Sequence, residues 1–124
     1  MRRRRGGRVF GLDVVVTRFF NVFGPRQPAD SPYSGVIAAF CRKLILGESV
    51  RIDGDGGQAR DFTFVEDLVD GVVRCLDGDS RGCVTVNLAY GDATTVMGVY
   101  EQLLGMTHAM LPDVETPPPE MAPP

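Results

Sequence analysis

The strongest structural signal in the chain lies in residues 14–27, VVVTRFFNVFGPRQ. Residues 14–18 are β-branched and almost continuously apolar, which is typical of a buried strand in a parallel sheet. Residues 19–33 contain Gly-Pro, Gln-Pro and Ser-Pro pairs that interrupt any helical or strand period, so they are predicted to form a loop. Ligands of open α/β sheets bind beyond the carboxyl ends of the strands, which is where this loop would lie.

Short strands and helices alternate through the rest of the chain. A helix over 35–46 has one apolar face, with Ser34 as its expected N-cap and Gly47 as its C-cap. A second helix is expected over 66–76, and a third over 96–104, capped by Thr94 or Thr95 and ended by Gly105. Further strands are predicted at residues 50–52, 61–65 and 84–88. This order predicts an α/β fold with about three helices and short strands.

Composition bounds the class of protein. The chain has 124 residues, 44% of them hydrophobic and 23% charged, which suits one small globular domain. No apolar run approaches the roughly 20 residues of a membrane span, and no signal-peptide core is present. The three cysteines are an odd number without a Cys-x-x-Cys pair. They indicate reduced thiols and a cytoplasmic location, and they favour neither a disulfide framework nor a metal site.

The two ends differ from the middle. Residues 1–7, MRRRRGG, are predicted to be a disordered basic tail. Four arginines could also bind nucleic acid or act as an import signal, but no other nucleic-acid motif accompanies them, so the tail is favoured. Residues 112–124 contain six prolines and no periodicity, and they are predicted to be a second disordered tail. Residues 8–111 are the expected folded segment.

The loop after the first strand carries the first candidate site. Its aromatic residues could pack a flat ring, and Asn21 could bond a phosphate or sugar oxygen. The alternative is that the phenylalanines are core residues and Asn21 stabilises a turn. The pattern alone does not separate these two interpretations.

The glycine-rich stretch at 53–57 leads to the second candidate, Arg60. Gly54, Gly56 and Ala59 match a dinucleotide-binding pattern, but residues 60–64 alternate like a strand instead of opening a helix. A calcium loop also fails, because Gln58 and Phe64 stand where glycine and glutamate are needed. What remains is a turn that delivers Arg60, either to a diphosphate or to a nearby carboxylate. On pattern alone the salt bridge is favoured.

Taken as an ordered set, these motifs resemble the extended short-chain dehydrogenase/reductase family of NAD-dependent nucleotide-sugar epimerases and dehydratases. The resemblance covers about residues 8–105 and is nearest to UDP-glucose and UDP-N-acetylglucosamine 4-epimerases. The matching motifs are Val9–Asp13, Arg18–Gln27, Ser31–Ile37, Gly54–Gly56, Arg60–Phe62 and Val65–Asp67. It implies the substrate-side segment of a Rossmann-like fold.

The resemblance also implies residue roles. Phe19 and Phe20 would lie near the nicotinamide ring of NAD, and Asn21 would contact the diphosphate of the nucleotide-sugar. Arg60 would clamp the same diphosphate. The uracil pocket would be lined by Val50, Arg51 and Ile52.

The chain departs from the family pattern in the parts that carry catalysis. It has no Gly-rich NAD loop and no Tyr-x-x-x-Lys, because Lys43 is its single lysine and residue 39 is alanine. A later arginine-bearing segment of the family is replaced by the proline-rich tail. We therefore expect a fragment cut at both ends, without an assignable catalytic residue, that binds a UDP-sugar weakly and does not hold NAD by itself. The alternative is a non-catalytic binding or interaction module that forms a homo-oligomer or pairs with a full-length homologue.

Overall fold

The computed structural model describes residues 11–30 and 35–123. The predictions for the basic tail at 1–7 and for Ser34 as an N-cap fall outside these residues. In chain order the elements are β1 (Val14–Phe19), β2 (Val22–Phe23), α2 (Val36–Ile45), β3 (Arg51–Asp53), β4 (Ala59–Arg60), β5 (Thr63–Phe64), α3 (Val65–Asp77), β6 (Cys83–Leu88), β7 (Thr94–Thr95), α4 (Val96–Met110) and β8 (Glu120–Ala122). The described residues thus form three helices and short strands, which confirms the α/β class.

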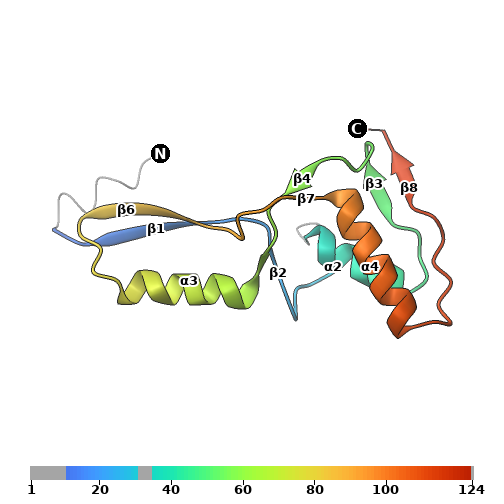
Figure 1. The fold of residues 1–124 in the computed structure, drawn as a ribbon, viewed down its shortest axis with the longest axis horizontal. Helices are drawn as coiled ribbons and strands as arrows, with labels where there is room; N and C mark the ends of the chain where they lie inside the picture. The colour runs from blue at the N-terminus through green and yellow to red at the C-terminus, as the bar shows by residue number, and fades with distance from the viewer. Residues whose placement is uncertain (1–10, 31–34, 124) are drawn as a thin grey trace.

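One part of the fold is a two-stranded parallel sheet covered by a helix. β1 pairs with β6 from Val14 opposite Cys83 to Phe19 opposite Leu88, and α3 lies along one face of this pair (Figure 1). A Cβ atom at Gly71 of α3 would come within 3.1 Å of Leu88 Cδ2, so the helix approaches the sheet closely at this glycine. The strands predicted at 14–18 and 84–88 and the helix predicted at 66–76 are confirmed.

The second part holds the main apolar core. α2 and α4 pack against each other and against β3, and the Phe40 and Tyr100 rings meet edge to face at 6.3 Å. Thr95 caps α4, because its Oγ1 accepts a hydrogen bond from the Gly98 N–H at 3.0 Å. Gly35 occupies the N-cap position of α2, and no side-chain cap bond is present there. The buried core residues are Phe40, Leu44, Val50, Ile52, Val96, Val99 and Tyr100.

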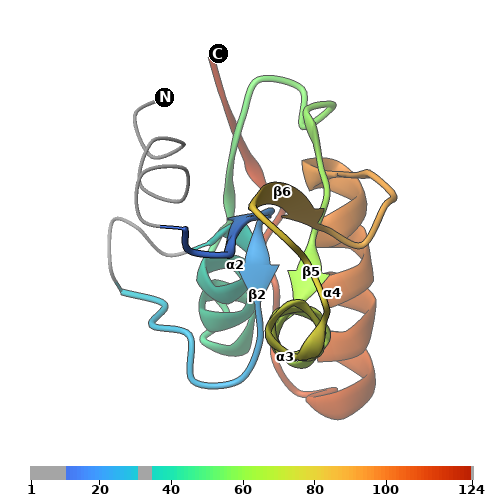
Figure 2. The same cartoon turned by 90° about the vertical axis from the view of Figure 1, so that its left-hand side faces the viewer.

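Two pairs of very short strands join the parts. β2 pairs with β5 in parallel, and β4 pairs with β7 antiparallel. Figure 2 shows β2 and β5 side by side, and in Figure 1 β2 lies between the sheet of the first part and the helices of the second. The sequence predicts a loop throughout residues 19–33, so strand β2 departs from that prediction. Two-residue strands carry no period that a sequence pattern could reveal.

The C-terminal region differs most from expectation. α4 does not end at Gly105 but continues to Met110. The segment 112–124, predicted to be disordered, contains β8, which pairs in parallel with β3. The Gly54 N–H donates to the Ala122 carbonyl at 2.7 Å, and the Glu120 N–H donates to the Val50 carbonyl at 2.8 Å. The prolines at 117–119 precede β8, so they remove no donor from this pairing.

Within the described residues, no helix has the length and apolar character needed to cross a membrane.

Candidate functional site

A cavity of about 460 Å³ opens at the junction between the two parts. Its walls come from the segment after β1, the start of α2, strand β3 and the stretch around β4. Four residues singled out from the sequence line it together: Asn21, Arg51, Ile52 and Arg60. They lie up to 39 positions apart in the chain, so the fold brings them together.

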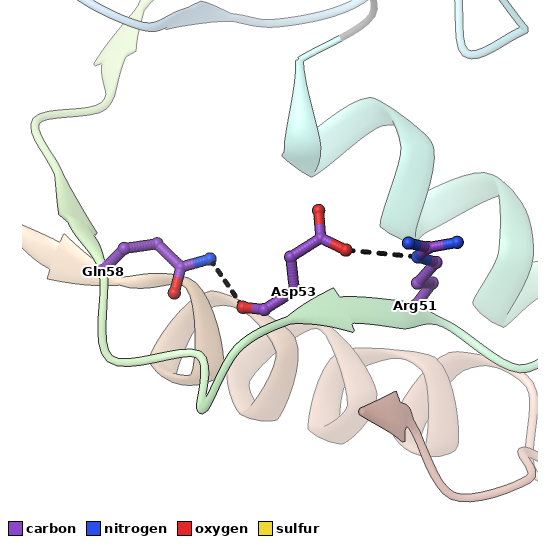
Figure 3. A network of polar contacts seen from close by, with 3 residues as sticks. All are labelled: Arg51, Asp53 and Gln58. Atoms are coloured by element: carbon purple, nitrogen blue, oxygen red, sulfur yellow. Dashed lines mark hydrogen bonds and ion pairs between the residues drawn. The ribbon is translucent and has the colours of Figure 1, made fainter. Parts of the chain in front are cut away.

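Strand β3 places two charged side chains on one face. Arg51 and Asp53 are two positions apart and rise from the same face, whereas Ile52 between them is 1% exposed. Arg51 Nε and Asp53 Oδ1 form an ion pair of 3.1 Å, and Gln58 Nε2 donates to the Asp53 carbonyl oxygen at 3.2 Å (Figure 3). Both charged side chains are about two-thirds exposed, so the pair contributes about 0–1 kcal/mol to stability.

Val50, predicted with Arg51 and Ile52 to line the uracil pocket, is not among the residues that line this cavity. It is 1% exposed and belongs to the apolar core beside Leu44. Side chains alternate along a strand, so Val50 and Ile52 share the core side while Arg51 and Asp53 take the other. Within 50–52, Arg51 therefore supplies the polar group that reaches the cavity.

Arg60 keeps its charge available. The side chain is exposed, and its Nη1 donates to the carbonyl oxygen of Ala59 at 2.8 Å. Across residues 11–30 and 35–123, no carboxylate lies within ion-pair distance of its guanidinium. The salt bridge favoured on sequence pattern is thus not found in this part of the chain. The guanidinium retains donors that can bind an anion at the cavity.

Asn21 is held from across the fold. Its side-chain Nδ2 donates to the main-chain carbonyl of Asp61 at 3.0 Å, and the main-chain carbonyl of Asn21 accepts from the Thr63 N–H at 3.1 Å. These partners lie about 40 positions away, so the side chain does not serve a local turn. Gly24, in the same segment, must lack a side chain, because a Cβ there would lie 2.5 Å from Val65 Cγ1.

Phe19 and Phe20 lie at the carboxyl end of β1, outside the cavity lining. They are 55% and 38% exposed, so the core interpretation does not hold for them. Exposed rings can pack a flat ligand ring, but a dinucleotide also needs a cradle for its phosphates. The stretch from Gly54 to Ala59 leads into β4 and not into a helix, which confirms that it is not a dinucleotide fingerprint. The described residues therefore do not fit a complete NAD.

Several lining residues were not anticipated, among them Gln27, Asp53, Gln58 and Phe62. Gln27 Nε2 donates to the Val22 carbonyl at 3.3 Å, which ties the loop after β2 to that strand. Asp53 could have been found, because it follows Arg51 at the spacing that puts two strand residues on one face. The others depend on long-range placement, for which the sequence carries no local signal.

Residues 4–89 match the model of the NAD dependent epimerase/dehydratase family. Among curated proteins, the chain is 35% identical over 107 residues to UDP-N-acetyl-alpha-D-glucosaminuronate decarboxylase of Bacillus cytotoxicus, covering 86% of this chain. It is 36% identical over 101 residues to UDP-glucose 4-epimerase of Mycolicibacterium smegmatis, covering 82% of this chain. The chain spans about a third of the length of these relatives, 33% and 32%.

Similar proteins are also found among solved structures. A crystal structure of UDP-glucose 4-epimerase with UDP-glucose, from Thermotoga maritima, is 31% identical and superposes with a TM-score of 0.83. That match covers 95% of this chain and 35% of the other. UDP-N-acetylglucosamine 4-epimerase from Methanobrevibacter ruminantium, in complex with UDP-N-acetylmuramic acid, is 34% identical with a TM-score of 0.74, covering 93% of this chain and 36% of the other.

Proposed function

This chain belongs to the NAD dependent epimerase/dehydratase family, and we propose that it forms the nucleotide-diphosphate side of a UDP-sugar site. The likeness to the two epimerase structures confirms the predicted Rossmann-like α/β segment. Both structures are described as complexes with UDP-linked sugars, which supports UDP as the nucleotide. Because the chain spans about a third of those proteins, the proposal concerns binding and not their whole reaction.

The observation that carries the proposal is that Arg60 and Asn21 line the same cavity. Arg60 has no carboxylate partner among the described residues, so its charge can neutralise a phosphate at little competing cost. Asn21 brings an amide to the same cavity, and Arg51 adds a second guanidinium. The Asp53 carboxylate already offsets the charge of Arg51. Arg60 is therefore the main diphosphate ligand, and β3 bounds the end where the base would lie.

NAD chemistry belongs to the family, and bound NAD supplies hydride transfer in it. In these 124 residues there is no Tyr-x-x-x-Lys to move a proton and no phosphate-binding Gly-rich loop before a helix. We expect these residues to bind and orient the nucleotide without turning over the sugar. Chain mixed with NAD and UDP-glucose should give no epimerisation above buffer, and reproducible turnover free of host epimerase would contradict this.

The binding proposal is tested by titrating UDP into the chain and following backbone amide resonances by NMR. We expect a dissociation constant on the order of millimolar, because the cavity is open and part of its wall is a loop. Arg60→Ala should weaken binding by about 1.5–3 kcal/mol, since it removes a charge-assisted contact.

The matched control is Arg81→Ala. Arg81 is also an exposed arginine, but it pairs with Asp13 at 3.3 Å and does not line the cavity. Its loss should leave the UDP affinity unchanged. Equal UDP affinities for Arg60→Ala and the parent would show that Arg60 does not hold the diphosphate.

A second candidate function is supported by the exposed apolar residues of α3. Val69, Val73 and Leu76 are 54%, 46% and 78% exposed and follow one another at helical spacing. This surface suits an interaction module that pairs with a second copy or with a full-length homologue. Co-purification of the chain with such a homologue tests it, and a chain recovered alone at every concentration would count against it.

A further inference from the structure

Asp61 accepts hydrogen bonds through both its carboxylate and its main-chain carbonyl. Its Oδ1 accepts the Tyr90 N–H at 2.9 Å, and its Oδ2 accepts the Gly91 N–H at 2.8 Å. The Thr63 hydroxyl donates to Oδ1 at 3.4 Å. The main-chain carbonyl of Asp61 accepts from Asn21 Nδ2 at 3.0 Å. Gly91 has φ +94°, so the turn that presents these two N–H groups favours glycine.

These contacts join the segments that connect the two parts of the fold. The chain passes from the sheet of β1 and β6 to the helices α2 and α4 after β1 and again after β6, and it returns between β4 and α3. Asn21 lies on the first of these passages, Asp61 on the return, and Tyr90 with Gly91 on the last. Asp61 is hydrogen-bonded to both of the other passages.

The same contacts fix the two proposed diphosphate ligands. Asn21 is held directly by the Asp61 carbonyl. Arg60 adjoins Asp61 in sequence, and it pairs with Thr94 of β7, the strand that follows the segment Asp61 holds. A displacement of residues 90–91 would therefore move β7, the strand that pairs with Arg60. Asn21, which lies on the segment after β1, would not move with it.

We propose that Asp61 is a positioning residue that keeps Asn21 and Arg60 at the separation at which both reach one diphosphate. The inference rests on the proposed function, since it concerns the same cavity. Asp61 itself touches no phosphate, because its two carboxylate oxygens are already bound to backbone N–H groups. A carboxylate is needed there, because both of its oxygens accept hydrogen bonds from backbone N–H groups. An asparagine side chain has one acceptor oxygen, and its NH₂ group would face one of these backbone N–H donors.

The test compares UDP with UMP, which lacks the second phosphate, in the parent chain and in Asp61→Asn. We expect Asp61→Asn to lower the UDP affinity about tenfold, which corresponds to the loss of one charge-assisted hydrogen bond. The UMP affinity should fall by less than about twofold. A residue that only supported the fold would lower both affinities by the same factor. The control is Asp92→Asn, which removes a carboxylate that caps only its neighbour Ala93, and it should change neither affinity.

A measurement on the parent chain keeps the test decisive if Asp61→Asn does not fold. Coupling between sites is reciprocal, so UDP binding should slow hydrogen exchange at the Tyr90 and Gly91 amides, and UMP should not. Unchanged exchange with UDP bound, or equal losses for UDP and UMP in Asp61→Asn, would overturn the inference and leave the proposed function standing. A parent chain that binds no UDP would remove the proposed function itself.

Discussion

Replacing Gly105 with alanine should stabilise the chain. The sequence predicts that Gly105 ends the last helix, whereas it lies inside α4, five residues before Met110. Its φ is not positive, and a Cβ added there would meet nothing within 4 Å. Alanine in an open helical position is favoured over glycine by about 0.8–1 kcal/mol. For a domain of this size that corresponds to a rise of roughly 3–5 °C in Tm.

Gly47→Ala supplies the opposite outcome in the same assay. Gly47 follows α2 with φ +68°, and a Cβ there would lie 2.9 Å from the Glu115 carbonyl oxygen. The left-handed conformation alone costs a non-glycine residue about 1–2 kcal/mol. Thermal melts by circular dichroism should therefore move up for Gly105→Ala and down for Gly47→Ala. A lower Tm for Gly105→Ala would mean that α4 ends near residue 105 and that the helix assignment is wrong.

Three further outcomes follow from burial. Leu44→Ala should cost about 2–5 kcal/mol in chemical denaturation, because Leu44 is 1% exposed in the main core, and a loss below about 1 kcal/mol would contradict that packing. Burial raises the pKa of the Cys41 thiol and of the Tyr100 hydroxyl, so the folded chain holds these protons more tightly than the unfolded chain. The free energy of unfolding should then be fully retained below about pH 8.5 and fall at higher pH. The fall should be less steep in Cys41→Ala, and the same pH dependence in this variant and the parent would show that Cys41 does not contribute to it. Leu76→Lys, at a 78% exposed position, should reduce self-association in sedimentation velocity without lowering Tm, and an unaltered profile would show that α3 does not mediate contacts between copies.

The longer regular elements could be predicted where the sequence has a clear apolar pattern. The continuous β-branched run fixed β1, and the apolar stripe of residues 66–76 fixed α3. Gly47 was identified correctly because a positive φ after a helix is a local requirement. Gly105 is also a glycine, but it has a different role. Its φ is not positive, and α4 continues past it to Met110.

The strand β8 and the short pairs β2–β5 and β4–β7 could not be predicted, because their stability comes from partners far along the chain. β8 lies in a proline-rich segment that has no period, yet its pairing with β3 buries Ala122. Ser49 adds to this contact by donating to the Pro118 carbonyl at 2.8 Å. Long-range pairing overrides local composition here, since backbone groups of a tail can be satisfied by any exposed strand edge.

The sequence suggested the chemistry of the candidate site but not how its residues come together. Phe19 of β1 lies opposite Leu88 of β6, and the two strands run parallel, so the segments that follow them leave the sheet at the same edge. Asn21 follows β1 and Gly91 follows β6, which brings both within reach of Asp61. The sequence proposed Asn21 and Arg60 separately, each with a structural alternative, and for Arg60 the pattern favoured that alternative. Their shared cavity favours the ligand-binding interpretation of both, because two independent turns or salt bridges would have no reason to face one space.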